Sequence, residues 1–241
     1  MLSTKHISLL FLPLLLVGCL YPDEQRKENQ IPYEDQLQSV QHAVTQYRED
    51  TGVLPIKTRE ADTPIFKKYP VDFSQLVPTY LQAAPGNSFE NGGIYQYVIV
   101  DPEDAAEVRL IDLRNVRAIQ DLERKIFQYR SEHSFAPIEM VIDNELLQLD
   151  HEKLNYDEAP VVESPFHPSH RLPLYMQTDG TVVIDYSLDI KYYAEEYGLG
   201  EFEEGDDLRW LLVAHSPFVP VYSMPQTIEN GEVIFITENG R

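Results

Sequence analysis

The sequence predicts an α+β protein in which three helix-plus-antiparallel-hairpin repeats follow a lipoprotein signal peptide. Three observations carry this prediction: a short apolar run that ends in a cysteine, an amphipathic helical pattern that occurs three times, and strand-like segments joined by Asp-Gly and Asn-Gly turns. Hydrophobic residues make up 43% of the 241 residues, which is enough for a packed core. The alternating strand-helix rhythm of a doubly wound sheet is absent from the sequence.

Residues 1–18 have the layout of a lipoprotein signal peptide. Lys5 is their only formal charge, the segment Ile7–Leu16 is almost entirely apolar, and Leu16-Val17-Gly18-Cys19 has the form of a lipobox. A helix needs about 20 apolar residues to cross a bilayer, and this run is shorter and contains a proline. A retained membrane helix and an ordinary secretory peptide with a chance cysteine are therefore the weaker alternatives.

Cys19 is the only cysteine, so the chain cannot form an internal disulfide. As the first residue of a mature lipoprotein it would carry diacylglycerol on its sulfur, and two acyl chains are enough for stable anchoring. Residues 19–33 then form the lipidated cysteine and a polar tether, which spans about 20 Å if it is coiled. The predicted location is the extracytoplasmic face of the cell membrane.

The charge balance limits the possible partners. The chain holds 19 Lys and Arg residues against 40 Asp and Glu residues, a formal charge of −21, which becomes −22 when residues 1–18 are removed. Such an excess argues against nucleic acid, whose phosphates must be met by basic side chains. It also argues against a body that lies flat on anionic headgroups.

Three helices are expected over residues 34–51, 116–133 and 187–197. Apolar side chains recur there in steps of three and four residues, which places them on one helix face. Gly52 and Gly198 stand where a helix favours a left-handed terminator. The apolar positions are Leu37, Val40, Val44 and Tyr47, then Ile119, Leu122, Ile126 and Tyr129, then Tyr186, Ile190 and Tyr193.

Each expected helix is followed by three features in the same order. The first is an irregular stretch with a leucine-bearing turn, at Asp72–Leu81, Asp150–Tyr156 and Asp206–Leu212. The second is a serine-phenylalanine marker, at Ser88-Phe89, Ser164-Pro165-Phe166 and Ser216-Pro217-Phe218. The third is a β-hairpin, with strands Ile94–Val100 and Glu107–Leu113, Leu172–Gln177 and Thr181–Asp185, and Val219–Met224 and Glu232–Thr237. This order predicts α+β units at 34–115, 116–186 and 187–241, either as one body or as a row of modules.

Part of the first unit resembles the soluble half of type II pseudopilins. The segments that carry the resemblance are Ala43–Pro55, Leu76–Leu81 and Tyr95-Gln96-Tyr97. In that family a helix ends in a tyrosine-acidic-glycine-proline run before a small sheet. The long apolar stem of pseudopilins is replaced here by a lipobox, so the resemblance implies local topology rather than filament assembly.

The whole chain is more similar to the YphF-type lipoproteins of Bacillus. The start Cys19-Leu20-Tyr21-Pro22 and the segment Lys68–Phe73 carry this resemblance. It implies a Gram-positive, extracytoplasmic location and does not by itself imply an activity. Some members carry a transporter-binding-protein label.

Candidate chemical groups are few. His167 and His170, with Glu163 nearby in the sequence, could offer metal ligands. Zinc sites, however, use three or four protein ligands, and no further cysteine is available. His215-Ser216 places a base beside a hydroxyl without a nucleophile-elbow motif. The glycine-bearing segment Asn87–Gly93 has no lysine and precedes a strand, which does not favour phosphate binding.

The densest charge is an acidic run that lacks the ligand spacing of a calcium loop, so a solvated loop is the favoured interpretation. Its members are Glu195, Glu196, Glu201, Glu203, Glu204, Asp206 and Asp207. Trp210 and the tyrosines could form a binding patch, but most of them stand at core spacing.

These observations predict a non-catalytic, membrane-anchored lipoprotein with no cofactor and no metal. Its expected partners are the bilayer, through diacylglyceryl Cys19, and an envelope protein or wall polymer. The alternative is a substrate-binding lipoprotein of an ABC-type uptake system, although such proteins usually have two α/β lobes around a cleft.

Overall fold

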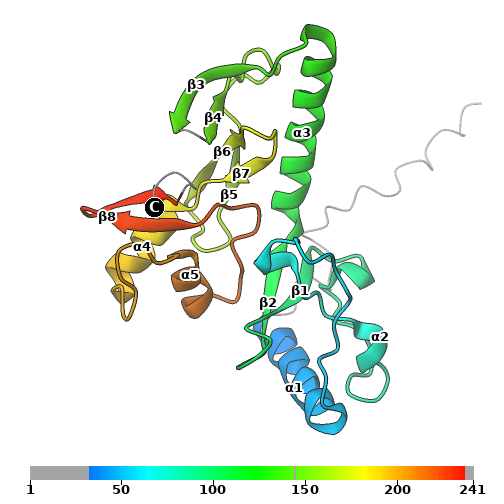
Figure 1. Cartoon of the computed structure of the whole chain (residues 1–241). Helices are drawn as coiled ribbons and strands as arrows, with labels where there is room; N and C mark the ends of the chain where they lie inside the picture. The colour runs from blue at the N-terminus through cyan, green and yellow to red at the C-terminus, as the bar shows by residue number, and fades with distance from the viewer. Residues whose placement is uncertain (1–32, 144, 237–241) are drawn as a thin grey trace, which may run out of the picture.

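The computed structural model describes residues 33–143 and 145–236 as a mixed helical and antiparallel-sheet protein with two lobes along a long helix (Figure 1). The expected signal peptide, lipobox and Cys19, and nearly all of the expected tether, lie outside these residues. Within the described ranges, no helix is both long and apolar enough to span a bilayer.

The first lobe consists of one helix packed on one hairpin. Helix α1 (Tyr33–Thr51) ends at Gly52, which adopts a φ of 74°. Its face buries Val40 and Val44, and the Gln41 side chain bonds to the hairpin backbone. The hairpin consists of β1 (Tyr95–Val100) and β2 (Glu107–Asp112), and the short helices η3 (Ile65–Lys67), α2 (Phe73–Leu76) and η4 (Phe89–Asn91) complete the lobe.

Helix α3 (Leu113–His133) joins the two lobes (Figure 1). It begins three residues before the expected start because the carboxylate of Asp112 accepts a hydrogen bond from the Arg114 N–H and caps the helix. It ends at Ser134, which adopts a left-handed φ of 66°. The expected apolar residues Ile119, Leu122 and Ile126 are buried.

The second lobe contains a five-stranded antiparallel sheet in the order β3-β4-β6-β5, with β7 paired to β6. The hairpin of β6 (Arg171–Gln177) and β7 (Val182–Ile184) confirms the expected strands around the Asp-Gly turn. Strands β3 (Ile138–Asp143), β4 (Leu146–Leu149) and β5 (Val161–Glu163) were not expected. They lack a strong turn dipeptide, and tertiary pairing with β6 completes the sheet.

The C-terminal part holds α4 (Ser187–Tyr197), α5 (Arg209–His215) and the hairpin β8 (Gln226–Glu229)–β9 (Glu232–Phe235). The expected turn at Asn230-Gly231 is confirmed, but the expected first strand Val219–Met224 is wrong. That segment bonds elsewhere: the Val219 N–H donates to the Leu110 carbonyl, and the Ile184 N–H donates to the Tyr222 carbonyl. The irregular stretch expected at Asp206–Leu212 instead runs into α5.

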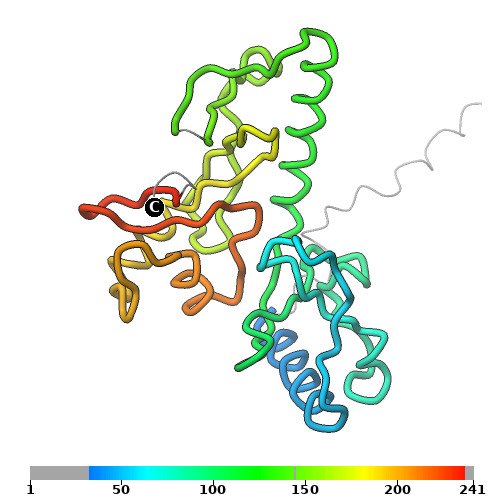
Figure 2. Tube along the Cα trace, viewed as in Figure 1, coloured from blue at the N-terminus to red at the C-terminus, as the bar shows by residue number. Residues whose placement is uncertain are grey.

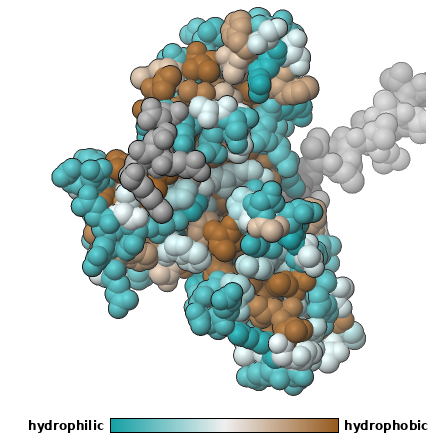
Figure 3. Space-filling view, viewed as in Figure 1, coloured by the Kyte–Doolittle hydropathy of each residue, from teal (hydrophilic) through white to brown (hydrophobic). Residues whose placement is uncertain are grey.

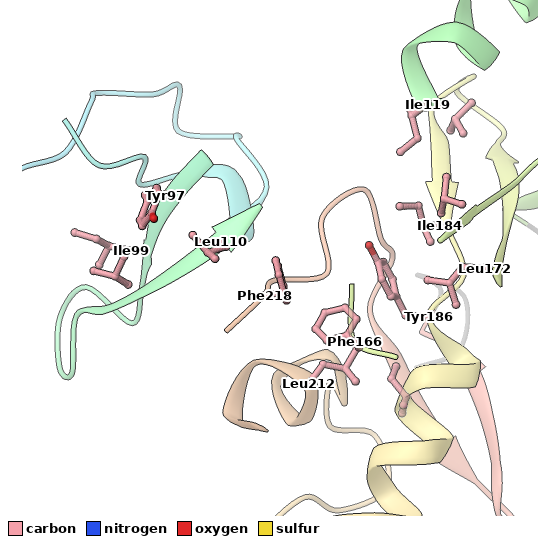
Figure 4. Close-up of a cluster of buried hydrophobic side chains, with 14 of the residues drawn as sticks. Tyr97, Ile99, Leu110, Ile119, Phe166, Leu172, Ile184, Tyr186, Leu212 and Phe218 are labelled. Carbon is pink, nitrogen blue, oxygen red and sulfur yellow. The ribbon is translucent and has the colours of Figure 1, made fainter. Parts of the chain in front are cut away.

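The segment between α5 and β8 links the two lobes (Figure 2). Phe218 lies between Leu110 of β2 and the group formed by Phe166, Tyr186 and Leu212 (Figure 4). All five side chains are buried in one continuous core that also includes residues of α1 and α3. Burial of a large apolar side chain contributes roughly 1.5–3 kcal/mol, so this core holds the parts of the chain together.

Candidate functional site

The histidines singled out from the sequence lie against a buried carboxylate. The Nδ1 atom of His170 lies 2.6 Å from one carboxylate oxygen of Asp189, and the Ser164 hydroxyl donates to the other oxygen at 2.7 Å. Asp189 is fully buried on α4, while 14% of the His170 side chain is exposed. The ring of His167 stacks on that of His170 with centroids 4.0 Å apart.

Burial raises the pKa of the Asp189 carboxyl, and the hydrogen bonds from Ser164 and His170 oppose that rise. An ionised Asp189 carboxylate can only accept, so it requires the proton on the His170 Nδ1 atom, and the lone pair of a neutral ring is then on Nε2. This arrangement orients a base, as second-layer carboxylates do for histidines at metal and catalytic sites. The described residues place no nucleophile in a hydrogen bond to this ring.

The structure does not bring Glu163 to the two histidines. Glu163 is 70% exposed and its carboxylate lies 3.9 Å from Arg171. The Nδ1 atom of His167 accepts the Ser169 N–H at 3.2 Å, so the neutral ring carries its proton on Nε2 and offers no lone pair there. Within the described ranges, no group of three or more His, Cys, Asp or Glu side chains is placed to hold a metal ion.

Asp189 is the site residue that sequence reasoning missed. It stands next to Ile190 and three residues after Tyr186, on the face of a helix whose other members are core residues. A lone carboxyl at a core position is a usable signal, because such a group needs a partner when it is buried. The loop that carries His167 and His170 supplies that partner, because His170 stands 19 residues before Asp189 in the chain.

His215 and Ser216 do not act together. The ring of His215 stacks on Tyr197 with centroids 4.1 Å apart, and the Ser216 Oγ accepts the N–H of Phe218 at 3.2 Å. Ser216 therefore fixes the turn of the serine-proline-phenylalanine segment. Ser164 does the same for Phe166, whose N–H it accepts at 2.9 Å.

Part of the acidic run borders an open pocket of about 510 Å³, lined by Glu201, Phe202, Asp206, Asp207 and Trp210. Asp207 pairs with Arg209 at 2.6 Å, and Asp206 accepts the Glu203 N–H at 2.9 Å. The indole of Trp210 also packs edge-on against Phe66 of the first lobe. The pocket thus combines aromatic and acidic groups, and two of its three carboxylates already have partners.

The glycine-bearing segment Asn87–Gly93 forms a turn that packs on itself. The Tyr97 hydroxyl donates to the Asn87 Oδ1 at 2.7 Å, and both side chains are buried. A Cβ atom added to Gly93 would lie 2.0 Å from the Asn87 carbonyl oxygen, so only glycine fits. The geometry explains the glycine without a bound phosphate.

Among the described residues, the longest run of exposed apolar side chains on consecutive positions lies on β3, at one edge of the five-stranded sheet. The exposed fractions are 39% for Ile138, 51% for Met140, 62% for Val141 and 40% for Ile142. Phe135, just before the strand, is 57% exposed. Figure 3 shows hydrophobic residues gathered over this strand near the top of the molecule. We call Phe135 and Ile138–Asp143 the β3 surface.

Contiguous exposed apolar area of this kind marks interaction sites more often than it marks ordinary protein surface. A strand at the edge of a sheet also presents unpaired backbone groups to a partner. The fold and this surface together describe an α+β protein with an exposed sheet edge.

Residues 33–112 match the YphF family N-terminal domain. This match supports the YphF-type resemblance over the first lobe, which comprises α1, α2 and the β1–β2 hairpin. No curated protein and no solved structure matches the chain.

Proposed function

We propose that this protein is a lipid-anchored, non-catalytic interaction module on the extracytoplasmic face of the cell membrane. The observation that carries the interaction role is the β3 surface, with its exposed Met140 and Val141 at a sheet edge. The anchor is argued from the lipobox Leu16-Val17-Gly18-Cys19, with two acyl chains on the cysteine sulfur. The partner would be another envelope protein or wall polymer.

The three helix-plus-hairpin units belong to this proposal as copies of one interaction unit. Its support is the order of elements, since α1, α3 and α4 each precede a hairpin whose strands are adjacent in the sequence. The second unit carries the additional strands β3, β4 and β5. The pseudopilin resemblance of the first unit extends the proposal only to local topology.

The anchor is tested by membrane fractionation of wild-type protein and a Cys19→Ala variant. We expect the wild type to remain in the membrane fraction after an alkaline wash and the variant to be released. Retention of the variant would contradict the lipid anchor. Cross-linking followed by pull-down from detergent-solubilised membranes tests the interaction role, and repeated recovery of no partner would contradict it.

A substrate-binding subunit of an uptake system is the second candidate, and the pocket beside Trp210 is the observation that favours it. Its ligand would be small and would contact Phe202, Trp210 and Glu201. Thermal-shift screening with amino acids, sugars and metal ions separates the two candidates. A shift of several degrees that a Trp210→Ala variant loses would favour transport.

A further inference from the structure

The β3 surface has features that select one kind of partner. β3 pairs on one side only, with β4, and among the described residues its other edge has no neighbouring strand. Five of its six residues are exposed, and they include three large apolar side chains in sequence, Met140, Val141 and Ile142. When a partner strand pairs with such an edge, the main-chain hydrogen bonds supply affinity. The side chains of the edge strand determine which partner sequence fits.

The charges on β3 are all of one sign. Glu139 and Asp143 are its only charged residues, and the whole chain carries a formal charge of −21. Opposite charges placed across a strand pair contribute about 0.2–1 kcal/mol, and like charges there are destabilising. A basic strand therefore matches this edge, whereas an acidic one does not.

A second copy of the same chain is a poor occupant for the same reason. It would bring another Glu139 and Asp143 and a second body of charge −21 to the contact. The register of β3 against β4 also shifts between Ile138 and Met140 and again between Val141 and Asp143. The like charges disfavour pairing with an identical copy, whereas the register shifts bear equally on any added strand. Anionic lipid is disfavoured by the same charges.

We propose that β3 accepts an added strand from a partner protein in which apolar residues alternate with lysine or arginine. This inference rests on the proposed interaction function and names its partner chemistry. The register against β4 places Ile138 and Val141 on one face of the sheet and Met140 and Asp143 on the other. The partner's apolar side chains pack beside Ile138 and Val141. Its cations lie on the other face, toward Glu139 and Asp143. The net negative field of the chain brings the basic segment to the edge and makes association sensitive to salt.

The test uses full-length protein in detergent and three fluorescent peptides. The first peptide alternates lysine with valine, the second has glutamate in place of lysine, and the third is the first with a central proline. We expect the first to bind wild-type protein, with weaker binding at high salt, and the other two to bind at least about tenfold more weakly, a difference of about 1.4 kcal/mol. Glutamate meets like charge, and proline removes a backbone donor.

Two variants locate the binding on the strand. Met140→Lys and Val141→Lys place cations at the edge, and we expect each to weaken binding of the lysine-valine peptide at least about tenfold. The matched control is Val161→Lys on β5, at the opposite edge of the same sheet, where the side chain is 42% exposed. The control should bind like wild type. Because all three side chains are exposed, thermal unfolding should show that each variant is folded.

Several outcomes overturn the inference. The first is equal affinity of the wild-type protein for the lysine and glutamate peptides, and the second is equal affinity of Met140→Lys and Val161→Lys for the lysine-valine peptide. The others are a concentration-dependent dimer of the wild-type protein, or its binding to anionic lipid vesicles, that Met140→Lys abolishes. The proposed function fails separately, when cross-linked wild-type protein yields no partner. If a partner is recovered equally with Met140→Lys, the interaction function stands and the β3 assignment falls.

Discussion

The Nδ1 atom of His170 lies 2.6 Å from a carboxylate oxygen of Asp189, which is fully buried beneath it. The contact joins the histidine loop to helix α4. It also gives a buried acidic group its partner, with Ser164 on the other oxygen. Because Asp189 is more deeply buried than His170, we expect substitutions of the two residues to lower the free energy of unfolding by unequal amounts.

We expect His170→Ala to cost more than Asp189→Asn. The first leaves a buried carboxylate with one hydrogen bond fewer, and we expect a loss of about 2–3 kcal/mol in the free energy of unfolding at pH 7. The second keeps an acceptor of the same shape for His170, and we expect about 1 kcal/mol. Urea denaturation at pH 7 measures both. Equal losses would mean that the carboxylate charge does not matter here.

The same pair predicts a pH dependence. Burial raises the pKa of the Asp189 carboxyl in the folded state above its usual value, so protonation favours the folded form. Stability linked to this group is complete below the ordinary carboxyl pKa and is lost as the pH rises through the raised one. His170→Ala should therefore gain stability between pH 7 and pH 5 relative to the double variant His170→Ala/Asp189→Asn. An unchanged difference between these proteins would contradict the direction.

Phe218 should be essential to the contact between the lobes. The centroid of its ring lies 5.5 Å from that of Tyr33 and 5.6 Å from that of Tyr95, and both tyrosines belong to the first lobe. Phe218 itself follows α5 in the chain. We expect Phe218→Ala to lower the free energy of unfolding by about 3–5 kcal/mol. Phe89→Ala is the matched control, because Phe89 belongs to the corresponding marker of the first unit but is 60% exposed.

That control should change the free energy of unfolding by less than about 0.5 kcal/mol. Chemical denaturation followed by circular dichroism measures both variants. A similar loss for Phe89→Ala and Phe218→Ala would show that the ring at position 218 is not specifically involved.

Gln41 should be a specific link between α1 and the first hairpin. Its side chain accepts the Val108 N–H at 2.7 Å and donates to the Ala106 carbonyl at 3.2 Å. Gln41→Ala removes both bonds, and we expect a loss of about 1–3 kcal/mol, since the backbone groups lose their partners. Gln38→Ala, on an exposed position of the same helix, should change stability by less than about 0.5 kcal/mol. Thermal unfolding distinguishes the two.

Asp72 caps the short helix α2, and its carboxylate accepts hydrogen bonds from Ser74 and Gln75. We expect Asp72→Ala to lower the free energy of unfolding by about 1 kcal/mol. The hydrogen bonds from Gln75 and Ser74 lower the pKa of the Asp72 carboxyl in the folded protein. The stability that this carboxylate adds is therefore complete above the ordinary carboxyl pKa, and it is lost as the pH falls through the lowered pKa of the folded state. Asp72→Asn should keep the cap and lose this acid sensitivity. An acid titration of stability that is the same in wild type and Asp72→Asn would contradict the assignment.

The candidate sites differ in how far the sequence could predict them. His167 and His170 could be named as a pair, but their partner Asp189 could not, because the contact depends on where α4 packs. The β3 surface was missed for a different reason. The segment 138–143 has no turn dipeptide beside it, and nothing in its composition shows that one edge of the strand stays uncovered.

The sequence by itself determined the local elements. Helical periodicity, Gly52 and Gly198 placed α1, α3 and α4 within a few residues, and the Asp-Gly and Asn-Gly dipeptides placed two turns, because these signals depend on neighbouring residues alone. Only the tertiary structure decided that residues 219–224 bridge the lobes instead of forming a strand, and that β3 lies at an open edge. Both outcomes depend on which distant backbone groups satisfy each other's hydrogen bonds, and that pairing is settled when the whole chain packs.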